Sequence, residues 1–90
     1  MPANIVLEKI KAGAAIVDVR DPEEFRDGAY PGSVNIPLSE LKKRLSEIPK
    51  DKPVVLYCQS GARSAAAARL LKKAGYTEVI NAGGLSDMPR

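Results

Sequence analysis

The sequence predicts an α/β domain with a small, mainly parallel sheet and helices on both faces. Two observations support this fold class. Short runs of branched apolar residues, such as 15–19 and 54–56, are typical of buried strands, and segments with helical spacing of apolar residues separate them. Strands joined by helices of about 10 residues form right-handed crossovers, which place helices on both sides of a parallel sheet.

The N-terminal part is expected to alternate helix, strand and helix. A short amphipathic helix is predicted over 5–10, with Asn4 as its N-cap and Gly13 at its end. The run 15–19 is then predicted to be a buried strand. Residues 21–24, Asp-Pro-Glu-Glu, are typical of a helix start, because Asp can cap it, Pro suits the first helical position and the second Glu can reach back.

The middle of the chain is expected to turn at 30–33 and to form a short strand over 34–36, which Pro37 ends. Ser39 is placed to cap the next helix, and Pro49 stops it. Apolar side chains recur on one face of that helix, namely Leu41, Leu45 and Ile48.

The C-terminal half is expected to hold the central strand, which begins at Val54 and leads into a tight loop. An alanine-rich helix over 65–74 follows, with Gly75 as its C-terminal cap. The last strand is predicted over 78–80. Gly83 and Gly84 then lead into a short tail, either as a simple turn or as a rim of the site.

Length and composition predict one domain over residues 1–90. A chain of this size buries somewhat over 60% of its unfolded surface, by a rough estimate. With 44% hydrophobic and 28% charged residues, it has the composition of a soluble globular protein without a membrane span. Charged residues within 1–15 argue against a signal peptide, so we expect a cytoplasmic location, and a periplasmic one if an export signal was removed.

Charge and residue usage exclude several functional classes. The net charge of +3 is a mild bias toward anionic ligands, and lysines such as Lys42, Lys43, Lys72 and Lys73 are dispersed on helices, which favours solvated faces over a nucleic-acid surface. One Phe, three Tyr and no Trp offer few platforms for base stacking. One Cys and no His exclude an internal disulfide, the usual zinc sites and Cys-His catalysis.

The single cysteine lies where the central strand meets the alanine-rich helix. The first backbone N–H groups of a helix lack partners inside it, so an anion at this loop is stabilised. Cys58 is therefore expected to be held as a thiolate, and Arg63 is expected to favour it and to receive an anionic substrate by a forked hydrogen bond. The alternative is that Cys58 is a small core residue at a strand end.

Two further residues are candidate supports for the loop. Asp18 and Arg20 follow the first strand, and the carboxyl ends of parallel strands share one edge of a sheet. Alternatively, Asp18 caps local backbone and Arg20 is a surface charge.

Four segments in order resemble the rhodanese, or thiosulfate sulfurtransferase-like, family over nearly the whole chain. The resemblance implies a rhodanese-like fold and a persulfide-forming nucleophile at Cys58, with Arg63 as the basic group and no metal or organic cofactor. It also implies an anion cradle made by Gln59, Ser60, Gly61, Ala62 and Ser64. The similar segments are Asp18–Phe25, Gly28–Pro37, Val54–Ser64 and Asn81–Leu85.

The sequence departs from the family's usual pattern at three positions. Ala29 and Tyr30 replace the usual His-Ile, which affects rim contacts or the choice of partner. Gln59 stands where relatives often have Arg, so one cation beside the thiol is missing and we expect weaker donor affinity. The expected donor is thiosulfate or another sulfane-sulfur compound, and the acceptor a thiol, cyanide or a thioredoxin-like protein.

Two other functions are weighed against sulfur transfer. Cysteine phosphatases and arsenate reductases also use a thiolate and an Arg, but with five residues between them, whereas four separate Cys58 from Arg63 here. The smaller loop suits a sulfur atom better than a phosphate. A regulatory or sulfur-carrier binding module is the non-catalytic alternative, although Cys58, Gly61 and Arg63 are all present.

Overall fold

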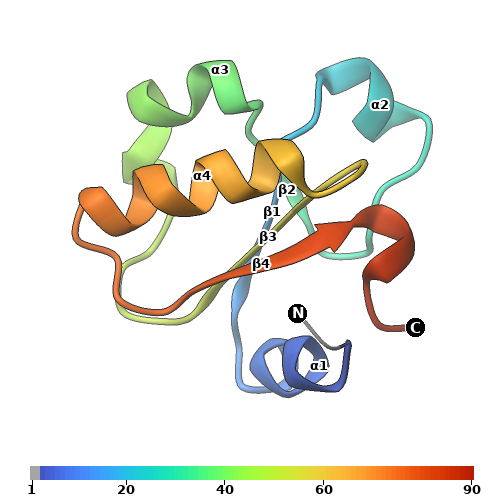
Figure 1. Ribbon diagram of the computed structural model, residues 1–90, viewed down its shortest axis with the longest axis horizontal. Helices are drawn as coiled ribbons and strands as arrows, with labels where there is room; N and C mark the ends of the chain where they lie inside the picture. The colour runs from blue at the N-terminus through green and yellow to red at the C-terminus, as the bar shows by residue number, and fades with distance from the viewer. Residues whose placement is uncertain (1–2) are drawn as a thin grey trace.

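The computed structural model describes residues 3–90, and its centre is a parallel four-stranded sheet with the order β2-β1-β3-β4 (Figure 1). Each neighbouring pair of strands is parallel. This confirms the predicted α/β class with a mainly parallel sheet. The strands are β1 (Ala15–Asp18), β2 (Val34–Asn35), β3 (Val54–Cys58) and β4 (Val79–Gly84).

Helices cover both faces of the sheet, as predicted. In Figure 1, α3 and α4 lie over one face, α1 lies under the other, and α2 stands beyond the carboxyl ends of the strands. The helices are α1 (Ala3–Lys11), α2 (Pro22–Arg26), α3 (Leu38–Leu41) and α4 (Ala62–Lys73), with short 3-10 helices η1 (Lys42–Glu47) and η2 (Leu85–Asp87).

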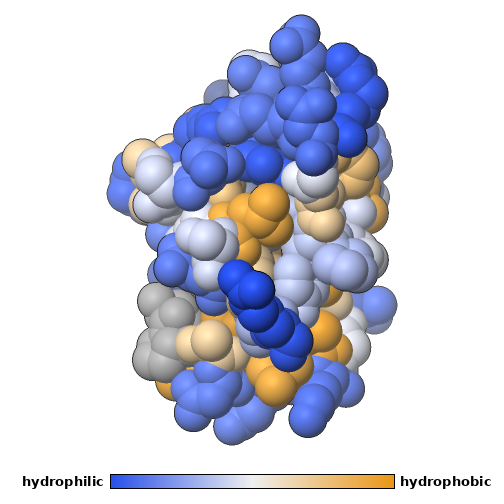
Figure 2. Space-filling model, turned by 90° about the vertical axis from the view of Figure 1, so that its right-hand side faces the viewer, coloured by the Kyte–Doolittle hydropathy of each residue, from blue (hydrophilic) through white to orange (hydrophobic). Residues whose placement is uncertain are grey.

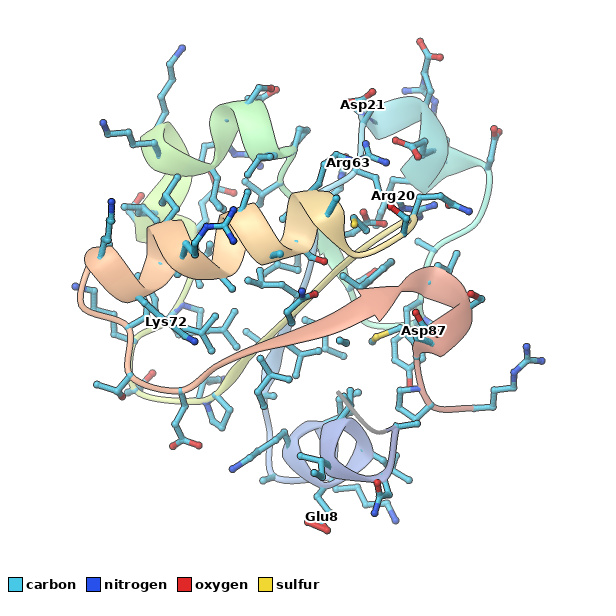
Figure 3. All side chains as sticks on the ribbon, in the orientation of Figure 1. Glu8, Arg20, Asp21, Arg63, Lys72 and Asp87 are labelled. Carbon is cyan, nitrogen blue, oxygen red and sulfur yellow. The ribbon has the colours of Figure 1, made fainter. Side chains whose placement is uncertain are left out.

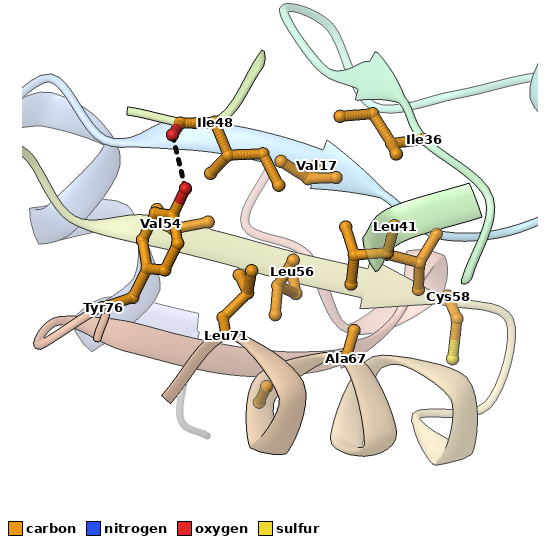
Figure 4. Packing of buried hydrophobic residues seen from close by; sticks show 12 residues of the cluster. Val17, Ile36, Leu41, Ile48, Val54, Leu56, Cys58, Ala67, Leu71 and Tyr76 are labelled. Atoms are coloured by element: carbon orange, nitrogen blue, oxygen red, sulfur yellow. Dashed lines mark hydrogen bonds between the residues drawn. The ribbon is translucent and has the colours of Figure 1, made fainter. Parts of the chain in front are cut away.

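The core consists of two apolar clusters, one on each face of the sheet. Because successive strand residues point to opposite faces, Leu56 and Cys58 pack toward α4, whereas Val55 and Tyr57 pack toward α1. Figure 4 shows the first cluster, in which Leu41 and Leu71 close over β3. All five residues of β3 are buried, so the central strand is a rigid base for the loop that follows it.

Several helix boundaries differ from the sequence prediction. Asn4 lies inside α1 rather than at its cap. The helix predicted after Ser39 begins at Leu38 with Pro37 as its N-cap, and it continues as the 3-10 helix η1, where Arg44 departs from helical geometry. Gly13 ends the α1 segment as predicted, with a φ of 96° and with the Ala14 N–H donating to the Lys9 carbonyl at 3.0 Å.

Two elements at the carboxyl edge of the sheet are longer than predicted. Helix α4 begins at Ala62 rather than Ala65, because Gly61 adopts a left-handed conformation and serves as its N-cap. Strand β4 continues to Gly84 instead of ending at residue 80, so the glycine pair belongs to the strand rather than to a turn. Both extensions bring backbone close to the loop after Cys58.

Candidate active site

Cys58 is the last residue of β3, and it lies at the carboxyl edge of the sheet beside the start of α4. Figure 4 shows its sulfur beside the loop that leads into this helix. The side chain is fully buried, at 0% exposure. Clefts at the carboxyl ends of parallel strands are where α/β proteins commonly bind ligands. The structure therefore places the predicted nucleophile at the predicted edge.

The loop wraps its backbone around the Cys58 sulfur. The Gly61 N–H donates to Sγ at 2.9 Å, and Ser64 Oγ lies 3.4 Å from the same atom. The φ of Gly61 is 103°, a left-handed value that strains any residue with a Cβ. A Cβ there would also lie 3.4 Å from the Cα of Gly83. Glycine thus lets the loop turn its N–H groups toward the sulfur while packing on β4.

The surroundings of Cys58 favour its thiolate. Burial raises the pKa of the thiol, but the hydrogen bond from the Ser64 side chain and those from the backbone of Ser64, Gly61 and Ser60 outweigh it. The net effect lowers the pKa below that of an ordinary cysteine. The sequence contains no histidine, so these hydrogen-bond donors at the start of α4 are what stabilises the Cys58 thiolate, as expected for an anion at a helix N-terminus.

Asn81 on β4 holds this loop through its side-chain amide. Its Oδ1 accepts hydrogen bonds from Ser64 Oγ at 2.6 Å and from the Gly83 N–H at 3.0 Å, and its Nδ2 donates to the Gly61 carbonyl at 3.3 Å. The Ser64 hydroxyl has one hydrogen, so Asn81 competes with Cys58 for it. Sequence reasoning noted Asn81 only as the first residue of the closing segment.

Gly84 is placed against the loop from the other side. A Cβ at this position would collide with the carbonyl oxygen of Gln59. The Gly84 N–H donates to Asp87 Oδ2 at 2.8 Å, which ties β4 to η2. The glycine pair therefore forms a wall of the site, which decides between the two roles considered for it.

Arg63 does not offer its forked donors to a substrate in this structure. Nη1 and Nη2 donate to Oε1 and Oε2 of Glu24 on α2 at 2.7 and 3.0 Å (Figure 3 labels Arg63 beside α2). Hydrogen bonds from Arg63 and from the Asp21 backbone lower the pKa of Glu24 to about 2. The expectation that Arg63 receives an anion missed this partner, which lies 39 residues away in the sequence.

Asp18 and Arg20 form a buried ion pair behind the sheet edge. Arg20 donates from Nε and Nη2 to the Asp18 carboxylate, with a shortest distance of 2.7 Å, and from Nη2 to the Gly28 carbonyl at 2.8 Å. Its guanidinium lies 5.6 Å from the centre of the Tyr57 ring. Throughout residues 3–90, neither side chain hydrogen-bonds to residues 58–64, so the pair supports β1 and the segment before β2 rather than the loop itself.

The remaining cradle residues face outward. Gln59, Ser60 and Ala62 are exposed, and among them Ser60 contributes its backbone N–H to the Cys58 environment. Gln59 lines a hollow of about 690 Å³ whose wall also includes Ala29 and Tyr30. The residues that depart from the family's pattern thus lie together. Figure 2 shows this face, with hydrophilic surface over its upper part and apolar surface visible in the middle.

Other classes of site receive no support from the described part of the chain. Within residues 3–90, no group of three or more His, Cys, Asp or Glu side chains is arranged to hold a metal ion. None of the helices in this range has the length and apolar character needed to cross a bilayer.

The comparison with protein families distinguishes the rhodaneses from the other enzymes that carry a cysteine in a helix-start loop. Residues 3–88 match the family model described as Rhodanese-like domain. The chain belongs to the rhodanese family. This confirms the resemblance seen in the four sequence segments, and it does not favour a phosphatase or arsenate reductase.

Curated relatives support the same family. The chain is 51% identical over 80 residues to the uncharacterized protein YqhL of Bacillus subtilis, covering 86% of this chain and 64% of YqhL. It is 43% identical over 74 residues to the thiosulfate sulfurtransferase PspE of Escherichia coli, covering 80% of this chain and 71% of PspE. A sulfurtransferase of Allochromatium vinosum is 45% identical over 77% of this chain. The chain spans 64% of the length of both the Bacillus and the Allochromatium proteins.

Solved structures show the same fold. A rhodanese with anions from E. coli superposes with a TM-score of 0.79 at 41% identity, covering 86% of this chain and 95% of that one. The human single-domain sulfurtransferase TSTD1 gives a TM-score of 0.84 at 29% identity, covering 93% and 88%. The agreement extends over nearly the whole of both chains.

Proposed function

We propose that this rhodanese is a sulfurtransferase that carries sulfane sulfur as a persulfide on Cys58. The observation that carries the proposal is the buried Cys58 sulfur, which receives the Gly61 N–H at 2.9 Å at the carboxyl edge of the sheet. Relatives named sulfurtransferase and thiosulfate sulfurtransferase support it.

The first half-reaction loads the cysteine. The Cys58 thiolate attacks the outer sulfur of thiosulfate or a similar donor, a new S–S bond forms at Sγ, and the donor's own S–S bond breaks. With thiosulfate, sulfite leaves with the bonding electron pair. The N–H groups of Ser60, Gly61 and Ser64 lie around Sγ and stabilise the anionic persulfide.

The second half-reaction needs an external acceptor. The 90 residues contain a single cysteine, so no second thiol of this chain resolves the persulfide. A small thiol or a thioredoxin-like protein attacks the outer sulfur, and the Cys58 thiolate leaves; cyanide serves the same purpose in an assay. Two separate half-reactions imply ping-pong kinetics.

Mass spectrometry of the intact protein tests the proposal. After incubation with thiosulfate and removal of excess donor, the parent protein is expected to gain the mass of one sulfur atom, and cyanide is expected to remove it as thiocyanate. Cys58→Ser is expected to lose both the adduct and the turnover while keeping the parent's circular dichroism spectrum. A protein that stays unmodified with several sulfane-sulfur donors would instead favour the binding-module alternative.

A further inference from the structure

The contact between Arg63 and Glu24 changes what the mouth of the site can bind. Arg63 is in the first turn of α4, and Glu24 is on α2, the short helix beyond the sheet edge. The two side chains meet through two parallel hydrogen bonds of 2.7 and 3.0 Å. Their side chains are 34% and 31% exposed, so the pair sits at the surface beside the loop. This forked geometry uses the guanidinium edge that would otherwise hold an oxyanion.

Glu24 is held in place from its own helix as well. Its Oε1 also accepts a hydrogen bond from the Asp21 N–H at 3.1 Å, which closes the start of α2. Both carboxylate oxygens therefore have partners in the structure. The Asp21 N–H thus orients the carboxylate that Arg63 binds, and a substrate anion has to compete with this oriented carboxylate for Arg63.

The charges near the loop leave little attraction for a dianion. Arg63 is the single basic side chain within residues 58–64, since Gln59 is neutral. Glu24 cancels its charge, and Asp21 is a second acidic group close enough to act on Arg63. Figure 3 shows Asp21 and Arg63 labelled next to each other. The other arginine at this edge, Arg20, is already paired with Asp18.

We propose that Glu24 selects the sulfur donor: by occupying Arg63, it disfavours the thiosulfate dianion and leaves the site suited to the protonated persulfide of an uncharged thiol. This rests on the function proposed above. In this loading step the Cys58 thiolate bonds to the terminal sulfur of R–S–SH, the donor S–S bond breaks, and the thiolate R–S⁻ leaves with the electron pair. The proton of the transferred SH group passes to the released thiolate R–S⁻, which is a stronger base than the Cys58 persulfide. The sulfane sulfur keeps its oxidation state. No oxidant or reductant is needed.

Glu24→Gln tests the proposal because it removes the charge and keeps a side-chain oxygen for the Asp21 N–H. The matched control is Glu47→Gln, which removes one carboxylate from the Arg44 pair on η1 and changes the net charge equally. For each protein, kcat/KM is measured with thiosulfate and with the persulfide of 2-mercaptoethanol, with cyanide as acceptor and with the uncatalysed reaction subtracted.

Glu24→Gln is expected to raise kcat/KM for thiosulfate by roughly fivefold to tenfold, mainly through a lower KM, and to change kcat/KM for the persulfide by less than about twofold. Glu47→Gln is expected to leave both within about twofold. Equal changes for both donors, or unchanged or weaker thiosulfate use by folded Glu24→Gln, would overturn the proposal. If the parent loads Cys58 from neither donor, the proposed function itself fails.

Salt dependence gives a second test, whose first measurement uses the parent protein alone. Because Arg63 is already neutralised, kcat/KM of the parent for thiosulfate is expected to stay within about twofold as sodium chloride shortens the Debye length from about 30 to about 3 Å. A steep fall in the parent would show that Arg63 attracts the anion despite Glu24. In Glu24→Gln, the fall is expected to appear.

Discussion

A free cysteine with a pKa of about 8.5 is only a few per cent thiolate at pH 7, and this chain has no histidine to act as its base. Cys58 depends instead on hydrogen-bond donors that the fold aims at one atom. The shortest comes from Gly61 at 2.9 Å, and Ser64 contributes both its hydroxyl and its backbone. At the level of single residues, the reactivity proposed for Cys58 depends on backbone geometry.

The titration of Cys58 tests this view. The rate of alkylation by iodoacetamide should follow the thiolate and reach its midpoint below about 8.5, because the folded-state pKa is lowered. Ser64→Ala should raise that midpoint, but only modestly, since the hydroxyl hydrogen is shared with Asn81. Ser46→Ala, an exposed serine on η1, is the control and should leave it unchanged. A parent midpoint at the ordinary value would contradict the role of the loop.

At the level of elements, the site consists of the loop after Cys58, which is held between helix α4 and strand β4. Helix α4 supplies the loop's end, and β4 supplies a glycine wall that permits the loop to approach. A side chain at residue 84 would push the loop away at Gln59, whereas a Cβ at residue 83 would meet the Asp87 side chain. The position of the N–H groups around Cys58 therefore depends on β4 as much as on the loop's own sequence.

Gly84→Ala tests this dependence on β4. The new Cβ would collide with the Gln59 carbonyl, so the loop must move and sulfur loading should fall by about 10² or more, as for misplaced anion donors. Gly13→Ala is the matched control, because its Cβ meets nothing within 4 Å and its cost is backbone strain alone, about 1 kcal/mol. Unfolding in urea and persulfide loading are measured for both variants. If Gly84→Ala and Gly13→Ala load sulfur equally well at equal folded fractions, β4 does not determine the position of the loop.

At the scale of the whole molecule, the Cys58 loop and the buried ion pair lie on opposite faces of the sheet. Cys58 and its loop lie on the α4 side, whereas Asp18, Arg20 and Tyr57 lie with the cluster that packs on α1. Asn35 joins this support by donating from Nδ2 to the carbonyls of Asp18 and Arg20. The buried ion pair holds the first two strands and their connection together, and its guanidinium lies over the ring of Tyr57, the residue before Cys58 on β3.

Arg20→Ala should therefore destabilise the fold rather than change the chemistry. It leaves Asp18 fully buried without its cation, which typically costs about 3–5 kcal/mol. Lys9→Ala, which breaks the exposed pair with Glu78, should cost no more than about 1 kcal/mol. Denaturant unfolding measures both free energies. Similar small losses in the two variants would show that the Asp18–Arg20 pair is not a structural support.

The sequence alone determined the fold class and the place of Cys58 at the edge of the sheet. Alternating apolar runs and helical segments specify a parallel α/β sheet, and a lone Cys before a Gly-Ala-Arg-Ser helix start places the thiol at its carboxyl edge. The capping role of Glu24 was also predictable, since it acts three residues away within one helix. These features are local, so residue type and spacing are enough to encode them.

The tertiary structure alone decided how the site is charged and held. The Glu24 side chain that caps α2 also holds Arg63, and Asn81 binds Ser64 across 17 residues. The reach of β4 to Gly84 and the side of the sheet that Asp18 faces were likewise undetermined by local pattern. Such contacts join elements far apart in the chain, and their partners are chosen by how helices and strands pack together, which neither propensity nor periodicity specifies.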